Sequence, residues 1–484
     1  MDLAHLPVDV IDRILVSLPD FKTLSAVIRT SKSIFYDVFQ NHPVSITRAI
    51  AHNVAGPCLV QALRIAYTDY ALNCTNGGFK DIAEEDDVLD RPLTRYVSSI
   101  LERNMEAARG LENLFSLRYK DKAHETSQLT YEESSRFLQA LHRISLGTTL
   151  IFMHKEEAFD PFEEYEEDDD DADDDDDDDG DDTTPEDRRG THLIDCVTQL
   201  YGTFNATDLK QIYDVALFLC QVNNWVVSDV QGFWPIARSP NWQDSIILDP
   251  TALWVAWSTH VRVEDTASSF ASHWEYACAV RLVAILRGIM EEKKLNSQRL
   301  KDARMGAILD TVEGEHDTCG RCHDECGLQL WGTTNIELWR RSKSMKDLTD
   351  SFLPGLLRSN MLIVDWIKKS LLLQRDDTGN RIFDMNKLAS EIFELANDSD
   401  SGSWVWDQDH WYCTACVDTV FKENLWKWLL AEKKKRGETI PEDCWYGYNC
   451  RTMTHKPEHA GKLNHLWDIV YYDSQLDMYL SIDI

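Results

Sequence analysis

The sequence predicts a mainly α-helical protein with few and short strands. Apolar residues recur at three- and four-residue spacing through most of the chain, which is typical of helices that pack one face on a core. Segments rich in β-branched and aromatic residues are rare. Seven of the twelve cysteines lie between Cys319 and Cys450. This clustering favours small irregular cysteine-rich parts near the carboxyl end, not a large sheet.

The first fifty residues predict three short helices. Pro7 lies in the first turn of the first helix, where its missing N–H costs no hydrogen bond. Phe21–Ile28 and Ser31–Gln40 supply the second and third helices, and Asn41-His42-Pro43 ends the third. Helices this short bury little surface among themselves, so we expect some of their apolar side chains to face a partner.

This segment resembles an F-box, which opens with Leu-Pro, continues with an acidic residue and apolar pairs, and reaches a short acidic turn. Leu6-Pro7, Asp9 and Leu18-Pro19-Asp20 follow that order, although the Trp that often closes the motif is absent. The likeness is greatest to F-box proteins of fungi, which dock on the adaptor of an SCF-type cullin–RING ubiquitin ligase. The resemblance implies an adaptor-facing set: Leu6, Pro7, Val10, Ile11, Ile14, Leu15 and Leu18. The alternative is a helical cap that packs on the rest of the chain.

Charge and aromatic content divide the rest of the chain. Of the 83 acidic residues, 22 lie in residues 156–187, which contain no Lys or Arg. Such a run repels itself and buries no surface, so we expect a disordered linker. All 16 Trp residues lie at or after Trp225. The predicted parts are an F-box-like module, a helical region, an acidic linker and an aromatic-rich domain: residues 1–50, 51–155, 156–190 and 191–484.

In these parts the sequence contains more helical signals than strand signals. Apolar stripes predict helices in three segments: Ser134–Ile144, Leu209–Leu219 and Trp274–Met290. Thr349-Asp350 is expected to cap a further helix that contains Leu356 and Ile367. The best strand candidates are Trp225–Val227 and Ile246–Leu248.

Composition and apolar run length bear on the location of the protein. With 43% hydrophobic residues and a net charge of −34, a basic surface that coats nucleic acid is excluded as the main feature. No signal peptide and no run near 20 apolar residues is found, so we expect a cytoplasmic or nuclear protein that does not span a membrane. The basic run Lys433–Arg436 fits either the end of a helix at Phe421–Leu430 or a nuclear-import signal.

The strongest chemical signal is a set of five cysteines in two turns: Cys319, Cys322, Cys326, Cys413 and Cys416. A Cys-x-x-Cys turn places two thiolates at adjacent corners of a Zn²⁺ tetrahedron, and two such turns complete a closed site. The long loop between them costs little, because closure entropy grows only logarithmically with length. Either Cys319 or Cys326 completes the site, and His316 or His323 could substitute. Gly327 suits a metal-loop turn. Free buried cysteines are the alternative.

A second set follows, with two thiols and two imidazoles: Cys444, Cys450, His459 and His465. His455 competes for one position, and Tyr446-Gly447 is expected to form the knuckle between the thiolates. The segment is too short and polar to form its own core, so metal binding would supply its folding free energy, on the order of 10–16 kcal/mol in small zinc fingers. We therefore expect two structural zinc sites and no catalytic one, since a closed four-ligand site leaves no position for water.

This second set resembles the poly(ADP-ribose)-binding zinc finger. The order Cys444-x-Tyr446-Gly447-x-x-Cys450 and the spacing of the two histidines fit that finger, but its Tyr-Arg pair is reduced to Arg451 and the gap to His459 is longer. The opening also looks like an RNA-binding finger of the Cys-Cys-Cys-His type, without the third Cys. The resemblance implies ADP-ribose or RNA as a ligand, whereas a purely structural zinc site is the simpler interpretation.

Motifs for nucleotide binding, zinc proteolysis and serine hydrolysis are missing from the sequence, so we expect a binding protein and not an enzyme. The preferred interpretation is a substrate-recognition subunit of an SCF-type ubiquitin ligase. It would dock the adaptor, and through it the cullin, by residues 1–50, and an unknown protein target by the carboxyl-terminal domain. The alternative is a zinc-finger binding protein for RNA or ADP-ribose with a purely structural helical cap at its amino end.

Overall fold

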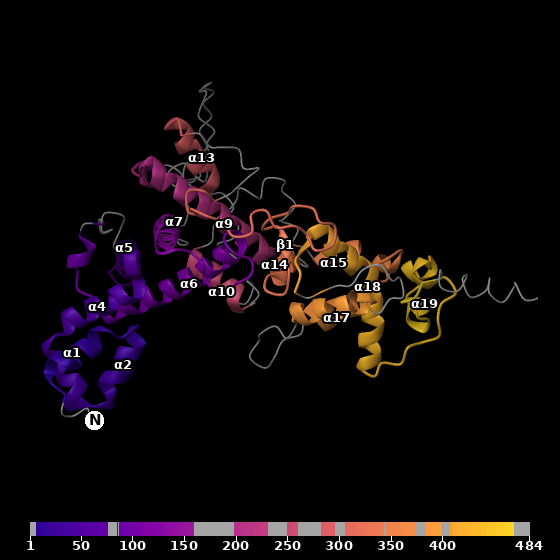
Figure 1. Cartoon of the computed structure of the whole chain (residues 1–484), viewed down its shortest axis with the longest axis horizontal. Coiled ribbons are helices and arrows are strands. Elements are labelled where there is room, and N and C mark those ends of the chain that lie inside the picture. Colours follow the sequence, from indigo (N-terminus) through magenta and orange to yellow (C-terminus); the bar gives the residue numbers. More distant parts are fainter. Residues whose placement is uncertain are drawn as a thin grey trace, which may run out of the picture.

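The computed structural model describes residues 6–75, 85, 87–158, 198–230, 249–259, 282–295, 305–342, 345–372, 384–397, 407 and 409–468. Within these residues the protein is mainly helical, as the sequence predicts. Figure 1 shows an elongated arrangement, with α1 and α2 at one end and α19 at the other. The predicted acidic linker, residues 156–190, lies outside the described residues except for 156–158, which end α7. The predicted strand Ile246–Leu248 lies outside them as well.

The amino-terminal module has a core of its own. It consists of α1 (Val8–Val16), α2 (Phe21–Thr30), a π-helical turn (Lys32–Tyr36) that runs into α3 (Asp37–Asn41), and α4 (Pro43–Ala55). The core is formed by Ile11, Leu15, Leu24, Val38, Ile46 and Ile50. The three predicted helices are therefore present. Pro43 also begins a fourth helix, since proline fits the first helical turn, and residue 50 lies inside that helix.

Specific polar contacts join this module to the body. The Glu102 carboxylate accepts hydrogen bonds from the backbone N–H groups of Phe21 (2.6 Å) and Lys22 (3.1 Å) at the start of α2, where helical N–H groups lack partners. Within the module, the Asn53 side chain of α4 donates to the carbonyl groups of Val16 (2.8 Å) and Leu18 (2.9 Å) at the end of α1. The module thus has its own group of buried residues, and the half-buried Phe21 and Val54 pack on both that group and the main core.

The body is a packed group of helices: α5 (Leu59–Thr75), α6 (Arg95–Tyr119), α7 (Tyr131–Ala158), α9 (Ala206–Val230), α10 (Pro250–Thr259) and α13 (Leu282–Glu292). Short 3-10 turns, Gly56–Cys58 and Val88–Asp90, precede α5 and α6. Helices α5 and α9 pack on α7, α10 packs on α6 and α9, and all belong to the main core. Residues before and after the predicted linker therefore share one core.

Two predictions for the body are confirmed and one is wrong. Ser134–Ile144 and Leu209–Leu219 lie in α7 and α9, as expected. Trp225–Val227, predicted as a strand, belongs to α9. Trp225 and Val226 are buried there, and burial in a helical layer outweighs the weak strand preference of such residues. Of the predicted helix Trp274–Met290, the structure describes the part from Leu282 onward, which is helical.

The carboxyl-terminal part surrounds a small antiparallel pair of strands, β1 (Leu330–Trp331) and β2 (Tyr412–Cys413), which the sequence did not predict. Its helices are α14 (Ile336–Arg341), α15 (Met345–Phe352), α16 (Met361–Ile367), α17 (Met385–Asn397), α18 (Thr414–Lys435) and α19 (Pro457–Lys462). A π-helical turn (Lys368–Leu372) follows α16, and 3-10 turns occupy Leu357–Ser359, Gly447–Asn449 and Thr452–Thr454.

The predicted helix cap at Thr349-Asp350 is wrong, because both residues lie within α15. Gly355 has a φ of +55°, a conformation that favours glycine, and separates α15 from the next turn. The Asn360 side chain caps α16 by accepting hydrogen bonds from the N–H groups of Leu362 and Ile363. The predicted helix at Phe421–Leu430 is present within α18, and Gly437 follows its end with a φ of +75°.

No helix in the part of the chain that the structure describes has both the length and the apolar character needed to cross a bilayer.

A buried ion pair joins α6, α7 and the segment that leads to the cysteines. Glu133, in the first turn of α7, accepts hydrogen bonds from the Lys120 ammonium (3.0 Å) and from the N–H groups of Asp310 (2.8 Å) and Thr130 (2.9 Å). Its side chain and that of Lys120 are 0% and 5% exposed. Burial alone would raise the pKa of Glu133, but these hydrogen bonds and the ammonium lower it below its ordinary value.

Replacing Glu133 by Gln should lower the free energy of unfolding by about 3–5 kcal/mol, because it leaves the Lys120 charge buried and unpaired. Since the folded-state pKa is lowered, the wild-type advantage should be complete above the unfolded pKa of about 4.3 and should disappear as the pH falls through the folded value. Urea unfolding at several pH values measures both effects. The exposed neighbour Glu132→Gln is the matched control, with an expected change within about 0.5 kcal/mol. Equal stability of the two variants would contradict the assignment.

Candidate metal centres

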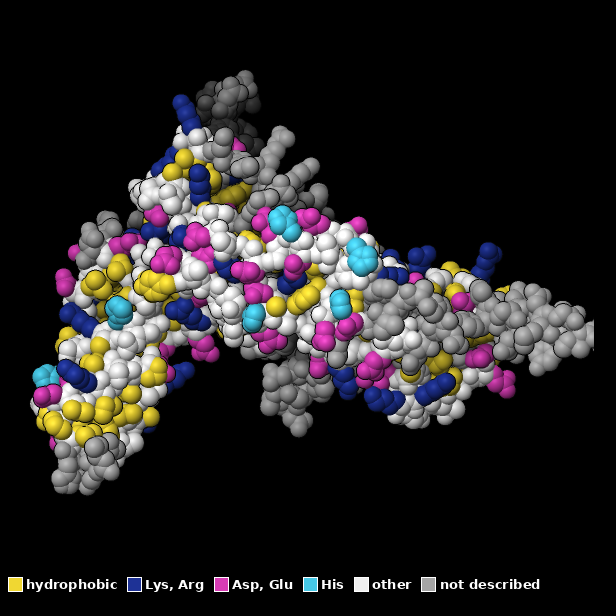
Figure 2. Space-filling model, in the orientation of Figure 1, with side chains coloured by type: hydrophobic (Ala, Val, Ile, Leu, Met, Phe, Trp, Pro, Cys, Tyr) yellow, Lys and Arg dark blue, Asp and Glu magenta, His cyan; other side chains and the backbone are white. Residues whose placement is uncertain are grey.

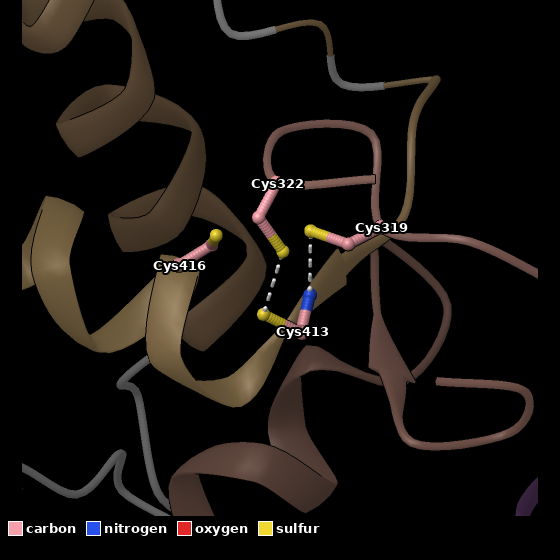
Figure 3. A group of neighbouring side chains, drawn as sticks. All are labelled: Cys319, Cys322, Cys413 and Cys416. Atoms are coloured by element: carbon pink, nitrogen blue, oxygen red, sulfur yellow. Dashed lines mark hydrogen bonds between the residues drawn. The ribbon is translucent and has the colours of Figure 1, made fainter. Parts of the chain in front are cut away.

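Four cysteine side chains converge in the carboxyl-terminal part: Cys319, Cys322, Cys413 and Cys416. Figure 3 shows their sulfur atoms pointing toward one another, two from one loop, one from the end of β2 and one from α18. All four sulfurs lie within 4.8 Å of one another, and those of Cys322 and Cys413 are 3.7 Å apart. A regular tetrahedron with Zn–S bonds of about 2.3 Å separates its sulfurs by about 3.8 Å. The group therefore has the dimensions of a four-thiolate metal site.

Backbone hydrogen bonds fix the loop that carries the first pair. The bridge between Thr318 and Glu325 closes a small hairpin, and the Cys319 N–H donates to the Asp324 carbonyl at 2.9 Å. The Gly320 N–H donates to the Trp411 carbonyl at 2.8 Å, which ties the loop to the segment before β2. The two turns thus approach each other through main-chain contacts.

The second pair lies where β2 becomes α18. Cys413 is the last residue of β2 and the residue just before α18, and Cys416 lies in the first turn of that helix. Free N–H groups and the positive end of the helix dipole stabilise negative charge at this position. A strand followed at once by a helix therefore presents both thiols on the side that faces the loop.

Backbone amide hydrogen bonds lower the pKa of one thiol of the first centre, that of Cys319. Burial alone would raise the pKa of Cys319, but amide hydrogen bonds, including those from Cys413 (3.2 Å) and Arg321 (3.4 Å), lower it to about 7. Burial and the neighbouring cysteines raise the pKa of Cys416. Without a cation, the Cys416 thiol therefore keeps its proton at neutral pH. A divalent metal would displace this proton, so its affinity would rise with pH.

Cys326 and the nearby histidines lie beside this group and not in it. Cys326 is half-buried, and Cys413 and Cys319 are close enough to affect the pKa of its thiol, which is raised first by burial. His316 pairs with Glu325 at 2.7 Å, and His323 is exposed. The structure thus favours Cys319 over Cys326 as the fourth ligand. Gly327 has the left-handed φ expected of a metal-loop glycine, +54°.

A second group forms near the carboxyl end: Cys444, Cys450, His459 and His465. The His459 Nε2 atom lies 3.6 Å from the Cys444 sulfur and 3.3 Å from the Cys450 sulfur, close to the separation of about 3.5 Å in a tetrahedral zinc site of mixed S and N ligands. His455, the predicted competitor, is exposed and outside the group.

The buried imidazole of His465 is the strongest indication that the second centre binds a metal. The residue is 2% exposed, and neither ring nitrogen has a hydrogen-bond partner among the described residues. Burial lowers its pKa, and the nearby His459 lowers it further, so the ring is neutral and able to act as a ligand. A buried polar group without a partner is costly. A metal ion at the centre would satisfy it.

The backbone conformation of Gly447 and a hydrogen bond to Asn464 position the ligands of the second centre. Gly447 has a φ of +46°, and a Cβ at this position would lie 2.5 Å from the Trp467 carbonyl oxygen, so the predicted Tyr446-Gly447 knuckle requires glycine. The Cys444 N–H donates to the Asn464 carbonyl at 2.8 Å. Asn464 directly precedes His465 and so connects both halves of the centre. Sequence reasoning missed this residue, whose one signal is its place beside a histidine ligand.

The predicted adaptor-facing residues lie in three different environments. Ile11 and Leu15 are buried in the core of the amino-terminal module, so the prediction that they face a partner is corrected. Leu6, Ile14 and Leu18 are half-buried. Pro7 and Val10 are exposed, together with two apolar residues not predicted to bind: Val8 and Val44. The resemblance implies that Ile11 and Leu15 face the adaptor, but α1 packs on α4 in one core, a long-range contact that the motif does not reveal.

Comparison with known protein families, curated proteins and solved structures finds no match to this chain.

Replacing Cys413 by Ser should remove the metal from the first centre and leave the second occupied, whereas Cys326→Ser should retain both metals. The reason is that Cys413 is one of the four converging thiols and Cys326 lies beside them. Elemental analysis of purified, zinc-supplemented variants measures the metal content per chain. Loss of metal from Cys326→Ser equal to that from Cys413→Ser would show that Cys326 is a ligand.

Proposed function

We propose that this protein is a substrate-recognition subunit of an SCF-type cullin–RING ubiquitin ligase. The amino-terminal module would dock the adaptor, and the carboxyl-terminal part would bind a protein target. The observation that carries the proposal is an amino-terminal module with a core of its own that exposes apolar side chains. It lies at the opposite end of the molecule from α19 and the second metal centre (Figure 1). This separation suits a protein that holds two partners at once.

The surface of that module supports a protein-binding role. Val8, Val10 and Val44 are 54%, 39% and 60% exposed, and Figure 2 shows hydrophobic side chains gathered over the amino-terminal helices. An exposed apolar patch on an otherwise charged protein is typical of an interaction site. Pro7 and Val10, from the F-box-like pattern, are among the exposed residues of the module, whereas Ile11 and Leu15 lie in its core.

The two cysteine-rich centres would hold structural zinc. Thiolate and imidazole ligands in tetrahedral groups of four favour Zn²⁺ over Mg²⁺ or Ca²⁺, which prefer oxygen ligands. With all four positions supplied by the protein, neither centre leaves room for a reactive water. In this proposal the chain is therefore not an enzyme, and it accelerates ubiquitin transfer by holding the target near the charged conjugating enzyme.

One observation favours a second candidate, a zinc finger that reads RNA or ADP-ribose. Trp445 and Tyr446, in the knuckle of the second centre, are 75% and 60% exposed. Exposed aromatic rings beside basic residues stack on bases in many nucleic-acid-binding proteins. The amino-terminal helices would then be only structural. Saturable binding of poly(ADP-ribose) or RNA, lost in Trp445→Ala, would favour this candidate.

Replacing Val10 by Asp should reduce capture by the purified SCF adaptor at least about tenfold, because a charge would be placed in an apolar interface. The exposed position should leave the helical content and metal content unchanged. Leu89→Asp is the matched control, since Leu89 is 47% exposed and lies outside the amino-terminal module. Undiminished capture of Val10→Asp, or no capture of the metal-loaded wild type, would contradict the proposal.

A further inference from the structure

A hollow of about 510 Å³ lies where the turn between α6 and α7 meets the two segments that enter the first metal centre. Its lining includes Lys120, Asp121, Lys122, Glu313, Asp317 and Trp411. Asp317 is two residues before Cys319, and Trp411 is two residues before Cys413. The volume is within the range of small-ligand sites in proteins, about 300–1,000 Å³.

The positive charges in the lining are already used. The Lys120 ammonium donates to Glu133 (3.0 Å) and to the carbonyl and hydroxyl oxygens of Thr311 (2.7 and 2.8 Å), which occupies all three of its N–H groups. The Lys122 ammonium is paired with Asp317. An anionic ligand would therefore have to compete with Asp317 for the Lys122 ammonium, the one of the two that is not fully hydrogen-bonded.

The negative charges are only partly used. Both carboxylate oxygens of Asp121 accept local hydrogen bonds, from Ala123 and His124. Glu313 is exposed, and its carboxylate bonds to no other described residue. Asp317 is 50% exposed and uses one carboxylate oxygen for Lys122. The hollow thus offers free carboxylate oxygens on one side.

Trp411 adds an aromatic wall that already attracts a cation. The Lys122 ammonium lies 5.4 Å from the ring centroid, within the range of cation–π attraction. The ring is held against Gly332, where a Cβ would approach it to 2.9 Å. The position of Lys122 therefore indicates that the Trp411 ring can bind a cation.

We propose that this hollow binds a cationic side chain of a partner polypeptide, with arginine the best fit. A guanidinium group is planar and can stack on Trp411 while it donates hydrogen bonds to Glu313 and Asp317. The net charge of −34 also attracts basic segments over a distance. The biological meaning of the site rests on the proposed function, since it gives the chemistry of the target.

The first metal centre would hold the walls of this hollow in place. The Trp411 carbonyl accepts from Gly320, in the first cysteine turn, and the Asp317 carbonyl accepts from Cys326 and Gly327. A metal that joins the two turns would therefore fix both walls. Chelation should weaken cation binding without any change to the lining side chains.

Calorimetric titration of the full-length, metal-loaded protein with acetyl-Gly-Arg-Gly-amide tests the inference. The matched probe carries citrulline, a neutral analogue of arginine, and should bind at least about tenfold more weakly. Glu313→Gln should weaken binding of the arginine peptide about five- to tenfold. Glu132→Gln, which removes the same charge from an exposed site outside the hollow, should leave it unchanged.

Equal binding of the arginine and citrulline peptides would overturn the inference, as would equal effects of the two glutamate variants. No saturable binding in the millimolar range would overturn it as well. Adaptor capture on the same samples separates the two proposals. Capture without arginine binding would reject only the hollow as a cation site. Arginine binding without capture would reject only the ligase role.

Discussion

The meeting of four thiols from two distant turns is the constraint on which the carboxyl-terminal part of the structure depends. Cys319 and Cys322 come from a hairpin loop, and Cys413 and Cys416 from the junction of β2 and α18. The same approach pairs β1 with β2 and brings Trp411 beside Asp317. Protonated thiols form only weak hydrogen bonds with one another. A divalent cation bound by all four sulfur atoms would hold the two turns together through strong metal–thiolate bonds.

Stability in the molecule is therefore divided between two kinds of interaction. The amino-terminal module and the helical body are held by apolar cores and by the buried Lys120–Glu133 pair. Residues 436–468 bury few apolar side chains, and they contain the buried His465, whose ring nitrogens have no hydrogen-bond partner among the described residues. Such a segment needs a metal to be well ordered. This division leaves exposed apolar side chains on the amino-terminal module and two candidate metal centres in the carboxyl-terminal part.

Features that depend on neighbouring residues could be predicted from the sequence, whereas contacts between distant segments could not. The stripes in α7 and α9, the two Cys-x-x-Cys turns and the glycines at 327 and 447 follow from spacing and backbone conformation alone. The choice between Cys319 and Cys326 depends on the hairpin closed by Thr318 and Glu325, which no spacing reveals. The β1–β2 pair is likewise non-local. The resemblance to an F-box implies a binding face that includes Ile11 and Leu15, whereas their burial depends on the packing of α1 on α4, which is also non-local.

Amide hydrogen exchange of the full-length protein, with and without chelation, tests the central claim most directly. If metal ions hold the carboxyl-terminal part, chelation should accelerate exchange at Gly320, Cys413 and Cys444 at least about tenfold, since their N–H groups are bonded within the two centres. The amides of α6 and α7 should remain protected by the apolar core. Unchanged exchange at the cysteine turns after complete metal removal would contradict the account.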